Sequence, residues 1–148
     1  MKIFLGSDHA GMDLKRQVKD FLHRSGHEVI DEGDDRLNPQ DDFPVFAARV
    51  VNGMKSSDDA EPLGILICGS GQGMCMAANR FKGIRAALCW NVREAHAARN
   101  DDNCNILCLS GRSTSLKEAE AIISTWLNTP FAGASRFVRR LKELDEIT

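Results

Sequence analysis

The sequence predicts an α/β protein in which helices cover both faces of a five-stranded parallel sheet. Short apolar runs alternate along the chain with longer segments whose apolar residues recur at helical spacing. The run at 63–68, Leu-Gly-Ile-Leu-Ile-Cys, is apolar throughout, as is typical of a strand that is buried on both faces. Such alternation produces parallel strands joined by crossover helices, and 148 residues suit one domain, so we expect a single domain over 1–148.

In the first half of the chain, turn-forming residues separate the expected elements. Leu14, Val18 and Leu22 fall on one helical face, and Gly26 is a common residue at a helix end. Residues 31–43 and 56–62 are polar and contain Gly or Pro, so they are expected to be loops. The elements expected here are a strand over 2–6, a helix over 12–25, a strand over 27–30, a helix from Pro44 and the strand over 63–68.

The second half continues the alternation and ends in an amphipathic helix. Pro130 ends the helix that precedes it, because proline cannot continue a helix. In the last helix Phe137, Leu141 and Leu144 lie opposite a basic face. The elements expected are a helix over 74–79, a strand over 85–89, a helix over 92–99, a strand over 105–110, a helix over 116–127 and the last helix over 135–147.

Composition excludes several classes of protein. Lys and Arg total 19 against 21 Asp and Glu, a net charge of -2, so no bulk nucleic-acid binding is expected. No apolar run approaches the roughly 20 residues of a transmembrane helix, so no membrane partner is expected. The five cysteines form no CxxC pair and lie mostly in apolar surroundings, which indicates a reducing, cytoplasmic environment rather than a disulfide framework.

Three alternate glycines, Gly69, Gly71 and Gly73, follow the central strand and precede a helix. This layout is typical of an anion site, since bare backbone N–H groups converge where the helix dipole is positive. Cys68 stands beside this loop, where a thiolate is stabilised, and is a candidate base or nucleophile. The loop is no GxGxxG and has no P-loop lysine, so no nucleotide cofactor is expected. The alternatives are a merely tight turn and a buried structural thiol.

Polar residues also follow the first and last strands. Asp8 and His9 come after the first, and Arg112 after the last, at the edge where ligands bind in such sheets. Arg112, together with Arg136 and Arg140 of the last helix, suits a phosphate dianion, although all three could be solvated charges. A base, an oxyanion cradle and a phosphate clamp suit proton abstraction next to a carbonyl.

Several motifs together resemble the type B ribose-5-phosphate isomerases, a family that includes galactose-6-phosphate and allose-6-phosphate isomerases. They are Gly-Ser-Asp-His-Ala-Gly at 6–11, Ile-Cys-Gly-Ser-Gly-Gln-Gly at 67–73, Ala-Ala-Asn-Arg at 77–80, Gly-Ile-Arg-Ala-Ala at 83–87 and Gly-Arg at 111–112. The resemblance implies a Rossmann-like three-layer α/β/α sandwich and cofactor-free aldose–ketose isomerisation. It also implies a homodimer, or a tetramer built from dimers, with active sites shared between subunits and the last helix packed on the partner.

The resemblance also implies roles for individual residues. Cys68 would be the base that forms the enediol, and Ser70 would contact substrate hydroxyls. Gly69, Gly71 and Gly73 would line the cradle, and Asp8 would bind the sugar hydroxyls. The phosphate would be held by four residues: His9, Arg112, Arg136 and Arg140.

One pair departs from the family pattern. The ribose enzymes have His-Asn before the last strand, and that His helps to open the furanose ring; this chain has Asp101-Asp102. Asp101 would act as an acid–base group only if its pKa were raised, with Asp102 as a substrate contact. Alternatively, ring opening is not needed, because a tetrose 4-phosphate cannot form a furanose.

The expected activity is therefore isomerisation of ribose 5-phosphate to ribulose 5-phosphate. The alternatives are isomerisation of a tetrose such as erythrulose 4-phosphate or of a hexose 6-phosphate, and a non-catalytic phosphosugar-binding module. Replacing Cys68 separates enzyme from binding module, because only an enzyme has turnover to lose.

Overall fold

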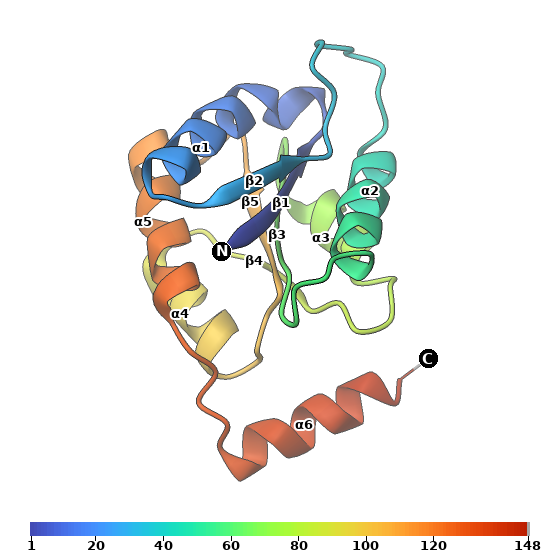
Figure 1. The fold of residues 1–148 in the computed structure, drawn as a ribbon. Coiled ribbons are helices and arrows are strands. Elements are labelled where there is room, and N and C mark those ends of the chain that lie inside the picture. Colours follow the sequence, from blue (N-terminus) through green and yellow to red (C-terminus); the bar gives the residue numbers. More distant parts are fainter. Residues whose placement is uncertain (148) are drawn as a thin grey trace.

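The computed structural model of the protein describes residues 1–147 and contains every strand and α-helix expected from the sequence (Figure 1). In chain order the elements are β1 (Lys2–Ser7), a 3₁₀ helix (His9–Gly11), α1 (Met12–Arg24), β2 (Glu28–Asp31), α2 (Phe43–Lys55), β3 (Leu63–Cys68), α3 (Gln72–Ala78), β4 (Ala86–Leu88), α4 (Val92–Asn100), β5 (Ile106–Ser110), α5 (Leu116–Asn128) and α6 (Ser135–Asp145). The 3₁₀ helix was not expected, and α3 begins at Gln72 rather than at Met74.

The five strands form one parallel sheet in the order β2-β1-β3-β5-β4. The register pairs Ser7 with Ile67 and Cys68 with Ser110, so β1, β3 and β5 end side by side. The chain segments that follow these three strands therefore meet at one edge, the carboxyl edge of the sheet. The opposite edge, where the strands begin, is the amino edge.

Helices cover both faces of the sheet, which confirms the three-layer architecture. Helices α1, α4 and α5 lie on one face and α2 and α3 on the other (Figure 1). Trp126 of α5 is fully buried in the first core, and Phe46 of α2 is buried in the second. Each large side chain buried in this way contributes roughly 1.5–3 kcal/mol, so the two cores hold the sheet edges in a fixed geometry.

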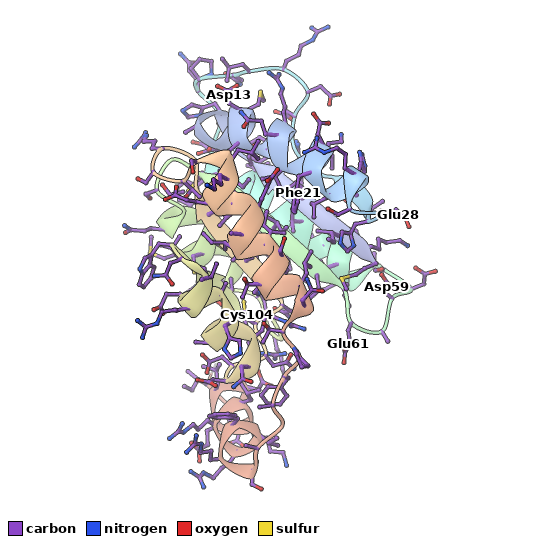
Figure 2. The ribbon with its side chains drawn as sticks, turned by 90° about the vertical axis from the view of Figure 1, so that its left-hand side faces the viewer. Asp13, Phe21, Glu28, Asp59, Glu61 and Cys104 are labelled. Atoms are coloured by element: carbon purple, nitrogen blue, oxygen red, sulfur yellow. The ribbon has the colours of Figure 1, made fainter. Side chains whose placement is uncertain are left out.

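The last helix, α6, lies apart from this body at the amino edge (Figure 1). In Figure 2, Asp13 at the start of α1 lies at the end of the body away from α6, whereas Cys104, just before β5, lies nearer to it. Arg85 Nη1 lies 4.0 Å from Asp145 Oδ1, an ion pair that joins α6 to the segment before β4. Leu144 is 49% exposed and Ile147 is 76% exposed, so part of the apolar face of this segment is uncovered.

The helices of the described residues are short. The longest, α1, α2 and α5, each have 13 residues, against about 20 for a bilayer span. Among residues 1–147, no helix is long and apolar enough to cross a membrane.

Candidate functional site

The turn between β3 and α3 has the predicted strand–loop–helix geometry. Gly71 has φ +78°, and a Cβ there would lie 2.9 Å from the Leu109 carbonyl, so only glycine fits without strain. A Cβ on Gly73 would lie 2.9 Å from the ring of Phe43. The loop is therefore packed tightly between β5 and the start of α2.

Cys68 lies at the start of this turn, as predicted. Its sulfur accepts a hydrogen bond from the backbone N–H of Gly71 at 3.2 Å, a contact that would stabilise negative charge on the sulfur. The side chain packs among the residues of the α2–α3 core, and the residue is only 5% exposed. A substrate that reaches this sulfur must therefore approach along the glycine loop.

The other four thiols differ from Cys68 in their surroundings. Burial raises the pKa of Cys89 to about 12 and that of Cys104 to about 11, and it raises the pKa of Cys108 still further. A hydrogen bond with Cys108 lowers the pKa of the half-buried Cys75 to about 7. All five cysteines are free, so no disulfide constrains the fold.

The turn after β5 fastens Arg112 against the glycine loop. The N–H of Gly111 donates to the carbonyl of Cys68 at 2.8 Å, and the N–H of Arg112 donates to that of Gly69 at 3.1 Å. A Cβ on Gly69 would lie 2.8 Å from the Arg112 guanidinium carbon, so the positive group rests directly on the loop. This confirms that Arg112 and the cradle are neighbours.

The turn after β1 completes the cluster. Asp8 is buried and accepts the N–H of Gly11 at 3.1 Å, and burial raises the pKa of its carboxyl. A Cβ on Gly11 would overlap the carbonyl of Ile67, so this turn rests on the end of β3. The carboxyl edge therefore gathers a defined set of groups, which we call the carboxyl-edge cluster: Asp8, His9, Cys68, the glycine loop 69–73 and Arg112.

Two further residues of this edge were not identified from the sequence. Asp41 Oδ1 lies 2.6 Å from His9 Nδ1, and the ring of Phe43 lies on Gly73. Both come from the segment 31–43, for which the sequence predicts only a polar loop. The aromatic residue before Pro44 could have drawn attention to Phe43, but no sequence signal connects Asp41 to His9.

The same edge offers a set of donors that a metal ion could use. One ligand atom from each of Asp8, His9 and Asp41 lies within 4.8 Å of the others. In this structure the carboxylates already accept hydrogen bonds from Gly11 and His9. A cation would have to displace those hydrogen bonds. The three side chains therefore suit the hydrogen-bonded arrangement at least as well as they suit metal binding.

Four predicted site residues lie elsewhere. Asp101 and Asp102 precede β5, and Arg140 of α6 faces Asp102, so this group belongs to the amino edge together with Arg136. Five strand residues at about 3.3 Å each separate the two edges by roughly 16 Å along β5. One chain thus builds half of the predicted site at each edge and does not bring the halves together.

The amino-edge carboxylates form an interacting pair. Asn100 Nδ2 donates to Asp101 Oδ1 at 2.7 Å. Partial burial and the charge of Asp101 raise the pKa of Asp102, and the nearby Arg140 opposes that rise. A carboxyl with a raised pKa is the better proton donor of such a pair.

A cavity adjoins each half. One of about 260 Å³ lies beside the glycine loop and is lined by Ser70, Gln72 and Ser110, among others. Another, of about 760 Å³, lies between α6 and residues 79–87 and is lined in part by Asp102 and Leu144. Cys68 lines neither cavity; the smaller one lies beside the glycine loop that follows it, and the larger one lies at the opposite edge of the sheet.

Comparison with known proteins matches the whole chain to one family. A model of the Ribose/Galactose Isomerase family matches residues 3–144. Ribose-5-phosphate isomerase B of Mycolicibacterium paratuberculosis is 39% identical over 146 residues, which is 99% of this chain and 91% of that protein. D-erythrulose-4-phosphate isomerase of Pectobacterium atrosepticum is 35% identical over 133 residues, 90% of this chain and 86% of that protein.

Solved structures agree in fold. Ribose 5-phosphate isomerase from Thermotoga maritima superposes with a TM-score of 0.93 at 44% identity, covering 99% of this chain and 98% of that one. The enzyme from Mycoplasma genitalium with bound ribulose-5-phosphate gives a TM-score of 0.90 at 41% identity, covering 97% and 93%.

Proposed function

Because the chain belongs to the Ribose/Galactose Isomerase family, we propose that it interconverts ribose 5-phosphate and ribulose 5-phosphate. The reaction is an aldose–ketose isomerisation, which moves a carbonyl between C1 and C2 of the sugar. The observation that carries the proposal is the thiol of Cys68 beside a glycine loop whose N–H groups can hold an oxyanion.

The chemistry follows from those two groups. The Cys68 thiolate removes the C2 proton of the open-chain aldose, the C–H electrons form a C1–C2 double bond, and the C1 oxygen becomes negatively charged. The N–H groups of the glycine loop stabilise that charge. The thiol then returns its proton to C1 while the O2 proton moves to O1, which gives the ketose. Ser70 is exposed at the loop and is our candidate for the hydroxyl contact near O1 and O2.

Substrate binding uses the rest of the carboxyl-edge cluster. We propose that Asp8 accepts hydrogen bonds from sugar hydroxyls and that His9 and Arg112 hold the phosphate. A guanidinium presents paired N–H groups that match phosphate oxygens. Arg112 lies on Gly69, so phosphate and reacting carbons would lie within one sugar length of each other.

The amino-edge residues would reach this substrate only from a second copy. We propose a homodimer in which Asp101, Asp102, Arg136 and Arg140 of one chain complete the carboxyl-edge cluster of the other. Three features support it: the position of α6 away from its own body, the uncovered Leu144 and the large cavity beside α6. In a two-fold dimer each chain gives and receives the same residues, so both sites are completed together.

A four-carbon substrate is the second candidate, and the Asp101-Asp102 pair favours it. Ribose 5-phosphate can close into a furanose ring, which must open before isomerisation, and ring opening needs a proton donor. This chain has Asp101-Asp102 in place of the His-Asn of the ribose enzymes, and for ribose 5-phosphate the candidate donor is Asp102, whose pKa is raised by burial and by the charge of Asp101. A tetrose 4-phosphate has its O4 esterified and needs no such donor, so the pair would serve only as a substrate contact.

The deciding experiment is a panel of C4, C5 and C6 aldose phosphates assayed with the purified protein. We expect the highest kcat/KM on ribose 5-phosphate. If the tetrose phosphate were preferred, the proposed substrate would be wrong but the proposed isomerase mechanism would hold. Binding without turnover of any member would leave a phosphosugar-binding module and overturn the proposal.

We also expect the protein to work in the cytosol. All five thiols are free, which suits a reducing compartment. The net charge of -2 gives no reason to expect nucleic acid as a partner.

A further inference from the structure

The contact between His9 and Asp41 joins two turns that are 32 residues apart. Asp41 Oδ1 accepts the backbone N–H of His9 at 3.1 Å and lies 2.6 Å from its Nδ1. The backbone N–H and the ring of His9 both contact the same oxygen of Asp41. Together, the two contacts restrict the backbone and the side-chain torsions of His9.

The contact also determines which ring nitrogen is free. An ionised carboxylate only accepts hydrogen bonds, so Nδ1 carries the hydrogen that points at Asp41. Nε2, on the other side of the ring, is left for a ligand. The His9 side chain is 33% exposed while that of Asp41 is 6% exposed, so the imidazole and not the carboxylate faces the site.

Burial of Asp41 suggests that its carboxylate is held there for this contact. Asp41 Oδ2 is buried and has no hydrogen-bond partner within residues 1–147, which is an unfavourable position for a carboxylate. The first part of the loop is held by contacts of Asp34: Arg49 Nη1 binds its Oδ1 at 2.9 Å, and Lys15 Nζ donates to its carbonyl at 3.2 Å. The two N–H groups of His9 are the contacts that offset this cost.

We infer that Asp41 is a positioning residue that holds His9 in one rotamer with a hydrogen on Nδ1, so that Nε2 faces the substrate phosphate and donates a hydrogen bond to it when the ring carries both protons. The inference rests on the proposed function for the identity of the ligand. It adds a residue from the β2–α2 loop that acts through His9 without touching substrate. A partner of this kind commonly changes affinity or activity about 10- to 100-fold when it is removed.

Kinetics of Asp41→Asn and Asp41→Ala test the inference, with Asp35→Asn as the matched control. Asp35 is an exposed carboxylate of the same loop, and its side chain lies outside the cluster. We expect KM for ribose 5-phosphate, and the inhibition constant of inorganic phosphate, to rise about 10-fold or more in both Asp41 variants, with a much smaller change in kcat. The control should match the wild type. A loss confined to kcat would contradict the inference.

The tautomer of His9 gives a second readout that needs no turnover. Nitrogen-15 NMR of the free protein, with the His9 signals assigned from His9→Gln, should show hydrogen on Nδ1 in the wild type and in Asp35→Asn. Asp41→Ala should show a mixture. A neutral wild-type ring with its hydrogen on Nε2 and none on Nδ1 would overturn the inference. If no sugar phosphate is turned over but inorganic phosphate shifts the His9 signals only while Asp41 is present, the proposed activity fails and the inference stands.

Discussion

The two edges of the sheet differ in how completely one chain builds them. At the carboxyl edge, the turns after β3 and β5 are hydrogen-bonded to each other, the turn after β1 packs on the end of β3, and Asp8 and Cys68 are buried. At the amino edge, α6 lies apart from the body, is joined to it by a 4.0 Å ion pair, and leaves a cavity of about 760 Å³. The difference indicates that the carboxyl-edge cluster is preorganised within the chain, whereas the residues on and beside α6 would reach such a cluster only in the proposed dimer.

The largest effect should come from the thiol of the preorganised edge. Cys68→Ala removes the proposed base, so kcat should fall about 100- to 10,000-fold while ribulose 5-phosphate still binds, as measured by calorimetry. Cys75→Ala is the control, because the pKa of Cys75 is lowered to about 7 yet its thiol lies outside the cluster. If Cys75→Ala lost activity and Cys68→Ala did not, the base would be Cys75 and the proposed role of Cys68 would be wrong.

The next prediction compares how much two ion pairs, one at each edge, contribute to the free energy of unfolding. Burial alone would raise the pKa of Asp31, but hydrogen bonds from Lys15 and Lys19 outweigh it and lower the pKa. Lys15 is 3% exposed, so Asp31→Asn leaves a buried ammonium and should cost about 3 kcal/mol in urea unfolding at pH 7. Asp145→Asn, in the exposed pair with Arg85, should cost less than about 1 kcal/mol.

The pH dependence of that cost has a defined sign. The pKa of Asp31 is lower in the folded than in the unfolded chain, so its contribution is present above the unfolded pKa of about 3.9. It is lost as pH falls through the folded pKa. The stability difference between wild type and Asp31→Asn should therefore shrink below about pH 4; a constant difference down to pH 2 would contradict the assignment.

A smaller effect tests the open edge. Arg140→Ala should lower kcat/KM about 10- to 100-fold, mainly through KM, because one phosphate contact is lost. A sharper measurement uses mixed dimers, which form when Arg140→Ala and Cys68→Ala are unfolded, mixed in equal amounts and refolded together. In a mixed dimer one of the two sites then has both Cys68 and Arg140, so about a quarter of wild-type activity should return. No recovery would mean that each chain builds its site alone.

The smallest effect concerns the loop itself. Gly71→Ala forces a φ of +78° on alanine and pushes its Cβ against the Leu109 carbonyl, so it should destabilise the fold by about 1–3 kcal/mol. Gly83→Ala is matched, since Gly83 has φ +81° but no atom within 4 Å of an added Cβ. The difference between the two Tm values isolates the packing of the loop; equal shifts would show that packing adds nothing.

Most of the local architecture could be predicted from the sequence because it depends on chain neighbours. The apolar run at 63–68 followed by alternate glycines predicts a strand, a turn and a helix, and these are present at Leu63–Cys68 and Gln72–Ala78. Asp8 and Arg112 could be placed at the carboxyl edge for the same reason, since each follows a strand directly.

The sequence by itself determined the alternation of strands and helices, the glycine loop beside Cys68 and the family. Only the tertiary structure decided which polar residues share an edge: it placed Arg112 on Gly69, brought Asp41 to His9 and left Arg140 at the opposite edge, which is separated from this one by the roughly 16 Å length of β5. The reason is physical. Periodicity records which side of its own helix or strand a residue faces, whereas distances between segments depend on strand order, register and loop path, which are set by the packing of the whole chain.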